Sequence, residues 1–109
     1  MSEITNEELG RRRFQIQKEK AVELAVEKIR RGKHPQWESL SPKDLQILKD
    51  ILGDIWTITD RTRWESITFS KLSPQNIESL IDIGKKIENN YCTAETAAKF
   101  LEDISNDKI

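Results

Sequence analysis

The chain has 109 residues, 34% of them charged and 36% hydrophobic, with a formal net charge of −1. This length and composition predict one folded domain over residues 1–109 and exclude a disordered chain, which would be poorer in aliphatic residues. No apolar run approaches the roughly 20 residues of a membrane span, and the single cysteine excludes an internal disulfide. Because residues 1–9 also lack the apolar stretch of a signal peptide, we expect a cytoplasmic protein with no membrane partner.

The small net charge hides an uneven distribution. Residues 1–9 carry three Glu and no base, residues 11–34 carry nine Lys or Arg against three Glu, and residues 35–109 carry nine bases against 13 acids. A basic segment between two acidic ones indicates a partner of opposite sign at the basic segment.

The first predicted helix extends from about residue 6 to residue 31. Its N-terminus has the spacing of a capping box at Thr5 and Glu8, and Gly32 is expected to end it. One side of this helix carries apolar residues at helical spacing and is predicted to face the core. These residues are Phe14, Ala21, Val22, Ala25 and Ile29.

This first helix is predicted to project beyond the rest of the domain. About 26 residues at 1.5 Å each give a length of roughly 39 Å, whereas a compact domain of this size has a radius of gyration of about 13 Å. Leu9 and Ile16 lie nearly opposite the core-facing side, and one core cannot easily bury both sides. The second stripe therefore predicts a surface for a partner or for self-association; an N-terminal segment folded back over the bundle is the alternative.

Two later helices open with nearly the same sequence, LSPKDLQILKDI and LSPQNIESLIDI, 32 residues apart. In both, a serine (Ser41 or Ser73) can cap the helix N-terminus, and the proline after it lacks only an N–H that has no partner in the helix. We interpret the repeat as one kind of helix start used twice, with an internal duplication as the alternative. The predicted helices are Pro42 to about Ile55 and Pro74 to about Asn89.

Residues 56–70 are ambiguous between strand and helix. Their threonines, isoleucines and phenylalanine favour a strand, but Asp60 and the tryptophans also fit one side of a helix. We predict a short helix that begins near Asp60, with a small hairpin as the alternative. Trp64 follows Arg61 and Arg63 closely in the sequence, so it is suited either to cation–π stacking on an arginine or to a place in the core.

The last predicted helix extends from about residue 94 to residue 104. Thr93 is expected to cap it, and residues 105–109 are expected to fray. Together these elements predict an all-α fold, an irregular bundle of four main helices plus a short fifth element.

Residues suited to catalysis or metal binding are sparse. The four glycines are scattered, so no phosphate-binding loop is present. His34 and Cys92 are the only histidine and cysteine, and their separation does not fit a metal site. A nucleophile pair of Cys92 and His34 is the alternative to structural roles for the two residues. Because Cys92 directly precedes a helix cap and His34 follows the end of a helix, we interpret Cys92 as a half-buried packing residue and His34 as an exposed loop residue. We expect no enzyme activity, no metal and no cofactor.

The predicted function is that of a small interaction or regulatory module. Such a module would dock through its long first helix onto another protein or a second copy of itself, with Leu9, Phe14 and Ile16 in contact. Trp37 joins this set because it lies between the first two helices and because tryptophan is enriched at interface hot spots; packing over the helix ends is the alternative for Trp37.

The basic residues of the first helix suggest a second function, that of a nucleic-acid-associated accessory or regulatory protein. The residues of this basic surface are Arg11, Arg12, Arg13, Lys20, Lys28 and Arg31. They would neutralise phosphates in a salt-sensitive manner. Against this function, the sequence pI is about 5.9, and Glu19, Glu23 and Glu27 form a row that we interpret as solvent-facing.

Overall fold

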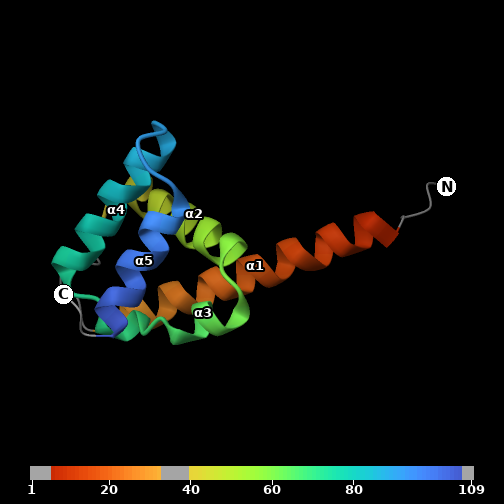
Figure 1. Cartoon of the computed structure of the whole chain (residues 1–109), viewed down its shortest axis with the longest axis horizontal. Coiled ribbons are helices and arrows are strands. Elements are labelled where there is room, and N and C mark those ends of the chain that lie inside the picture. The colour runs from red at the N-terminus through yellow and green to blue at the C-terminus, as the bar shows by residue number, and fades with distance from the viewer. Residues whose placement is uncertain (1–5, 33–39, 107–109) are drawn as a thin grey trace.

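The computed structural model describes residues 6–32 and 40–106. Within these ranges every regular element is helical (Figure 1). In chain order the elements are α1 (Asn6–Arg31), α2 (Pro42–Ile58), α3 (Arg61–Ser66), the short 3-10 helix η2 (Phe69–Lys71), α4 (Pro74–Glu88) and α5 (Ala94–Ser105). The predicted all-α class is therefore confirmed. The hairpin considered for residues 56–70 is wrong, because that stretch holds the end of α2, all of α3 and the start of η2.

The serines in the two similar sequences start their helices as predicted. The Ser41 hydroxyl accepts the Asp44 N–H at 3.1 Å, and the Ser73 hydroxyl accepts the Asn76 N–H at 3.1 Å. The Asn76 side chain also accepts the Ser73 N–H at 2.9 Å, which completes a capping box. The predicted cap at Thr93 is wrong in one respect, because its side chain makes no capping hydrogen bond to α5.

α2 continues to Ile58, three residues past the end predicted at Ile55. The β-branched residues at this end favour strand in isolation, but their hydroxyl groups find partners within the helix. Thr57 donates to the Gly53 carbonyl at 2.8 Å, and Thr59 donates to the Ile55 carbonyl at 2.7 Å. The hydroxyl groups of this last turn are therefore paired within the helix rather than left without partners.

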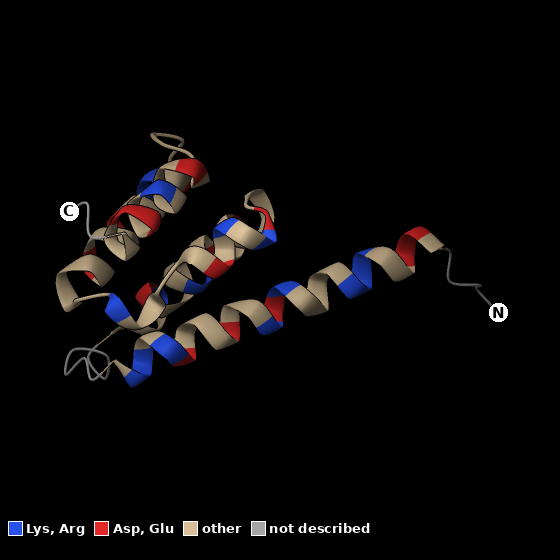
Figure 2. Ribbon diagram, turned by 60° about the horizontal axis from the view of Figure 1, so that its bottom comes forward, with Lys and Arg blue, Asp and Glu red and all other residues tan. Residues whose placement is uncertain are grey.

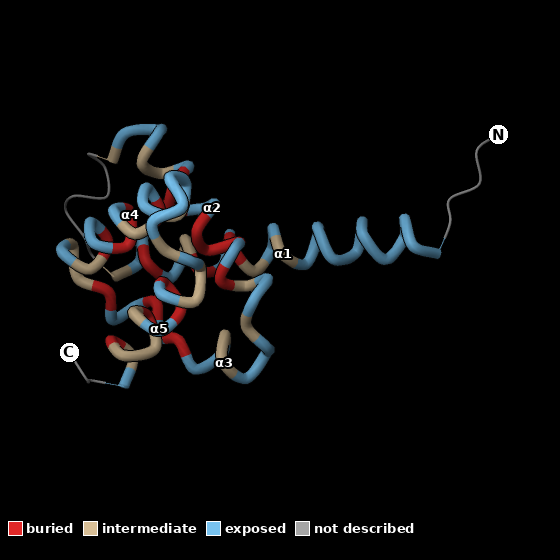
Figure 3. The backbone as a smooth tube through the Cα atoms, turned by 45° about the horizontal axis from the view of Figure 1, so that its top comes forward, coloured by how far each residue is buried: buried red, intermediate tan, exposed pale blue. Residues whose placement is uncertain are grey.

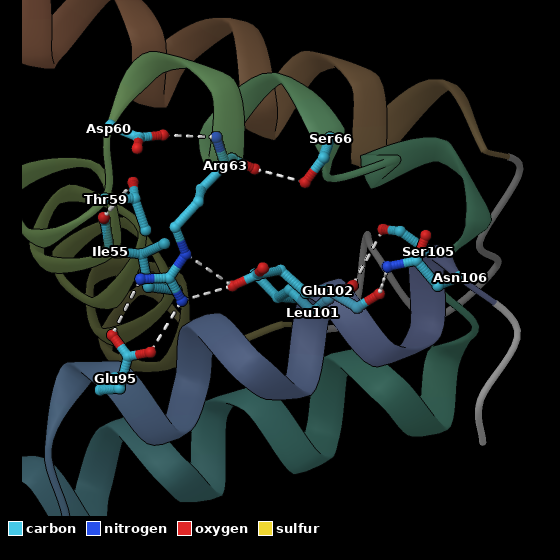
Figure 4. A network of polar contacts seen from close by, with 10 residues as sticks. All are labelled: Ile55, Thr59, Asp60, Arg63, Ser66, Glu95, Leu101, Glu102, Ser105 and Asn106. Atoms are coloured by element: carbon cyan, nitrogen blue, oxygen red, sulfur yellow. Dashed lines mark hydrogen bonds and ion pairs between the residues drawn. The ribbon is translucent and has the colours of Figure 1, made fainter.

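α3 starts beside Asp60, as predicted, and is joined to α5 by one arginine. The Asp60 carboxylate accepts the Arg63 N–H at 2.7 Å. The Arg63 guanidinium reaches across to two carboxylates on α5, with Nη2 2.7 Å from Glu95 Oε1 and 2.6 Å from Glu102 Oε1 (Figure 4). The hydrogen bonds that Arg63 donates to Glu95 and then to Glu102 raise the pKa of Arg63, and the bonds from Arg63 lower the pKa of Glu95.

The core is aliphatic and centres on α2, which packs against α1, α4 and α5. No polar or charged side chain in the described residues is buried, so apolar burial holds the helices together at roughly 25 cal/mol per Å². α4 approaches α2 closely at Gly84, where an added Cβ would lie 2.7 Å from Ile47 Cγ2. The buried residues of α2 are Ile47, Leu48, Ile51, Leu52, Gly53 and Ile55.

The C-terminal end of α5 is tied to the segment before η2. Ser105 is the first residue of the stretch expected to fray, yet it lies within α5. Its hydroxyl donates to the Leu101 carbonyl at 2.9 Å and accepts the Thr68 N–H at 2.7 Å. The expected fraying of residues 107–109 lies outside the described residues.

α1 projects from the bundle. Only its C-terminal half supplies buried residues, Val22, Ala25 and Ile29, and its N-terminal end extends into solvent (Figures 1 and 3). Residues 6–17 are all exposed, and we call this segment the arm and the remaining described residues the body. The principal extents of 51 × 29 × 28 Å and a radius of gyration of 15.0 Å reflect the arm.

Candidate functional site

The arm carries large apolar side chains that the body does not cover. Leu9, Phe14 and Ile16 are 38%, 44% and 51% exposed. At 3.6 residues per turn, Leu9 and Ile16 lie on one side of α1, opposite the side that packs on the body. These two residues form a stripe with solvent around it, which is the feature expected of a docking surface.

Phe14 belongs to a different side of α1. Its ring centroid lies 4.9 Å from that of Trp56 on α2, with the ring planes tilted by 54°. This contact fixes the base of the arm to the body and is a favourable aromatic geometry. The structure therefore separates Phe14 from Leu9 and Ile16, with which it was grouped.

Phe14 and Trp56 form one end of a groove of about 570 Å³ between α1 and α3, which we call the aromatic groove. Trp64 lies further along this groove, with its ring 5.1 Å from that of Phe69. Of the two roles considered for Trp64, the structure favours packing against the core, because the neighbouring Arg63 guanidinium is bound to carboxylates on α5.

The basic surface of α1 is divided into two clusters. Arg11, Arg12 and Arg13 lie on the arm, whereas Lys28 and Arg31 lie at the other end of the helix, about 22 Å or more away at 1.5 Å per residue. Acidic residues lie among the basic ones along the helix between these clusters (Figure 2). Arg11 is 3.9 Å from Glu7 and Arg31 is 3.2 Å from Glu27, and such exposed pairs contribute little stability.

Lys20 lies between these two clusters and is exposed. It faces the same side of α1 as Leu9, Glu23 and Glu27 at helical spacing. The predicted basic surface is therefore interrupted by carboxylates at its centre. A single continuous basic patch on α1 is not formed.

A second groove, of about 640 Å³, runs between α1, α2 and the end of α4, and we call it the acidic groove. The charged residues that line it have a net charge of −3: Lys18, Glu19, Glu23, Lys49, Asp50, Asp54 and Glu88. Partial burial and then the nearby charge of Asp50 raise the pKa of Asp54, while Lys18 opposes the shift. The groove therefore holds more negative charge than its own lysines neutralise.

Sequence reasoning missed the acidic groove. Glu19 and Glu23 were interpreted as a solvent-facing row, and Asp50 and Asp54 were not considered as a pair. The four-residue spacing within each pair indicates one helix face, which was an available signal. That these two faces lie beside each other and beside Glu88 could not be predicted, because it depends on how α1, α2 and α4 pack.

Within residues 6–32 and 40–106, no group of three or more His, Cys, Asp or Glu side chains could hold a metal ion. Cys92 is half-buried and its thiol donates to the Ile83 carbonyl at 3.7 Å. Thr5, His34 and Trp37, which were considered as a cap, a catalytic partner and a docking residue, lie outside the described residues.

No helix in the described part of the chain is both long enough and apolar enough to cross a bilayer. No protein-family model, curated protein or solved structure matches this chain. The arm and the two grooves beside it are therefore the features of the molecule that indicate a function.

Proposed function

We propose that this chain is a non-catalytic interaction module of the cytoplasm that docks through the arm of α1. The observation that carries the proposal is the exposure of Leu9 and Ile16 on a helix that projects from its own domain. Fully burying a side chain of this kind contributes about 1.5–3 kcal/mol, so two of them can anchor a contact. No catalytic residue and no cofactor is assigned.

The three arginines of the arm complement this apolar stripe. Arg11, Arg12 and Arg13 are all exposed, and consecutive residues on a helix point in directions about 100° apart. Charges around an apolar contact raise the rate of association and select the orientation of the partner more than they raise affinity. The expected partner therefore presents carboxylates around an apolar surface.

Site-specific photo-crosslinking in cells tests this proposal. A photo-reactive amino acid at Ile16 should give a discrete crosslinked product, whereas the same amino acid at Tyr91, which is 81% exposed on the body, should give none. Equal products from the two positions, or no product at Ile16, would contradict docking through the arm.

A substitution in the stripe provides the second part of the experiment. With the photo-reactive amino acid at Arg13, the double variant Leu9→Asp, Ile16→Asp should lose the product. Its helix content should be retained in circular dichroism, because neither residue is buried. A global loss of helix would show instead that the stripe belongs to the folded core.

Nucleic-acid binding is a second candidate function, favoured by the exposure of three consecutive arginines on the arm. Phosphate contacts lose affinity steeply as salt rises, whereas apolar docking does not. A fluorescence-anisotropy titration with labelled duplex and single-stranded DNA and RNA at low and raised salt distinguishes the two. Salt-sensitive binding that is abolished by replacing Arg11, Arg12 and Arg13 with Gln would support this function over protein docking.

A further inference from the structure

We infer that the partner of the arm is a second copy of this chain, with the two α1 helices antiparallel and each arm lying along the acidic groove of the other copy. The inference rests on the proposed docking function of the arm and names its partner. Three features support it: the lengths of the two halves of α1, the spacing of the residues on its exposed side, and the charges of the arm and the groove.

The two halves of α1 are nearly equal in length. The arm covers residues 6–17, and the part of α1 that belongs to the body covers residues 18–31, which is about 18 Å against about 21 Å. A twofold axis between residues 17 and 18 therefore lays each arm along the whole body half of the other α1. The two bodies then lie toward opposite ends of the helix pair.

The exposed side of α1 has the alternating three- and four-residue spacing of a two-helix seam. The residues of this seam are Leu9, Arg12, Ile16, Glu19, Glu23 and Val26. In the antiparallel arrangement Leu9 meets the half-buried Val26, Arg12 meets Glu23, and Ile16 meets the aliphatic part of Glu19. Symmetry repeats each of these three contacts once.

The charges of the two surfaces are complementary. The arm has a net charge of +1, because Arg11, Arg12 and Arg13 outnumber Glu7 and Glu8, and the acidic groove has a net charge of −3. Arg12, on the seam, faces Glu23 of the other copy, which lines the acidic groove. Arg12 of each arm thus adds a positive charge at the edge of the other copy's groove.

A symmetric arrangement also resolves a problem of contact area. Stable complexes bury roughly 1,200–2,000 Å² in total, and one arm of about three turns can supply only part of that. The antiparallel pair uses both arms, both body halves of α1 and both α2 flanks. In this way the surface of α1 and the flank of α2 form the interface in both copies.

This arrangement contains one repulsive contact, which gives a test by gain of affinity. Arg13 of one copy faces Lys20 of the other on the outer edge of the helix pair, where both side chains are exposed. Lys20→Glu would replace this contact with an attractive pair. The dissociation constant of the dimer should then fall severalfold, since exposed pairs contribute up to about 1 kcal/mol each.

Charge exchange between Arg12 and Glu23 tests the pairing directly by sedimentation equilibrium of the full chain. Arg12→Glu and Glu23→Arg should each raise the dimer dissociation constant about tenfold or more, because like charges then meet at two symmetric positions. The double variant Arg12→Glu, Glu23→Arg should restore it to within about threefold, as a coupled pair requires. Glu78→Arg, on the exposed side of α4, is the matched control and should leave the constant unchanged.

Two results would overturn the inference in different ways. A monomer at every concentration up to the millimolar range would exclude a second copy as the partner, yet a crosslink from Ile16 to a different protein would leave the docking function intact. A dimer that the double variant does not restore would exclude the antiparallel pairing. Absence of both the dimer and the crosslink would refute the inference and the proposed function together.

Discussion

Arg63 and Glu95 face each other across the gap between α3 and α5 in a fork-to-fork pair, with Nη2–Oε1 at 2.7 Å and Nη1–Oε2 at 3.2 Å. Glu102 accepts a further hydrogen bond from Nη2 at 2.6 Å (Figure 4). α3 has six residues and none of them is buried. Its position therefore depends on this pair and on the contact between Trp64 and Phe69.

Replacing Arg63 should loosen α3 and lower the thermal midpoint of unfolding. Arg63→Ala should have the larger effect, because it leaves two carboxylates without their partner. Arg63→Lys should recover part of the loss, since it keeps the charge but cannot form the two parallel bonds of a guanidinium. Circular dichroism during heating measures both variants.

Arg61→Ala is the matched control for this series. Arg61 is 91% exposed and its pair with Glu65 lies within α3, so its loss should change the midpoint little. Equal effects at the two arginines would contradict a role for Arg63 in holding α3 against α5.

The same pair makes stability depend on pH at the acidic end. Hydrogen bonds from Arg63 lower the pKa of Glu95, so the folded state binds the proton less tightly than the unfolded state does. The stabilisation is complete above the ordinary glutamate pKa of about 4.3 and is lost as the pH falls through the lower, folded-state value. Urea unfolding of the wild type and of Glu95→Gln, repeated across the range from about pH 2.5 to about pH 7, measures this effect. The difference in free energy of unfolding between the two proteins should shrink at the acidic end.

The three helix starts should differ in their sensitivity to alanine. Ser73→Ala and Ser41→Ala should each lower the free energy of unfolding by about 1 kcal/mol, because both serines accept a first-turn N–H. Thr93→Ala should cost less, since the Thr93 side chain makes no such bond. Urea unfolding measures all three, and a loss at Thr93 as large as that at Ser73 would contradict the assignment.

Gly84 and Gly10 should respond to alanine with opposite signs. At Gly84 the new Cβ would lie 2.7 Å from Ile47 Cγ2, a methyl group on a stiff β-branched side chain, and overpacking of this kind costs about 1–3 kcal/mol. Ile47→Leu removes that methyl group, so the double variant Gly84→Ala, Ile47→Leu should lose less stability than Gly84→Ala alone. At Gly10 nothing lies within 4 Å of the new Cβ, so Gly10→Ala should raise helix content through propensity alone.

The start of each described helix in the body was predictable wherever its cause lies within a few residues. Ser41, Ser73 and Asp60 each accept a hydrogen bond from the N–H three residues ahead, and their side-chain type already indicates that bond. The end of α2 was placed too early because its last turn is rich in β-branched residues, which favour strand in isolation. Single-residue propensities do not include the hydrogen bonds that Thr57 and Thr59 make to the preceding turn. Thr93 has the right type for a cap but not the bond.

The site was less predictable than the fold. Leu9 and Ile16 stand out because a helical period assigns them to a second side of α1. The same period could not show that Phe14 contacts Trp56, which is 42 residues away, or that the acidic face of α1 meets that of α2. Such relations depend on packing between helices, and packing is set by the whole core.

The arm also has a consequence for the dynamics of the chain. Its helical state is nucleated in the body, where Val22, Ala25 and Ile29 are buried, and it then propagates outward one residue at a time with little net free energy per step. Gly10 weakens that propagation further. The amide protons of the arm should therefore exchange with solvent faster toward the N-terminus, and a partner that covers the arm should slow that exchange.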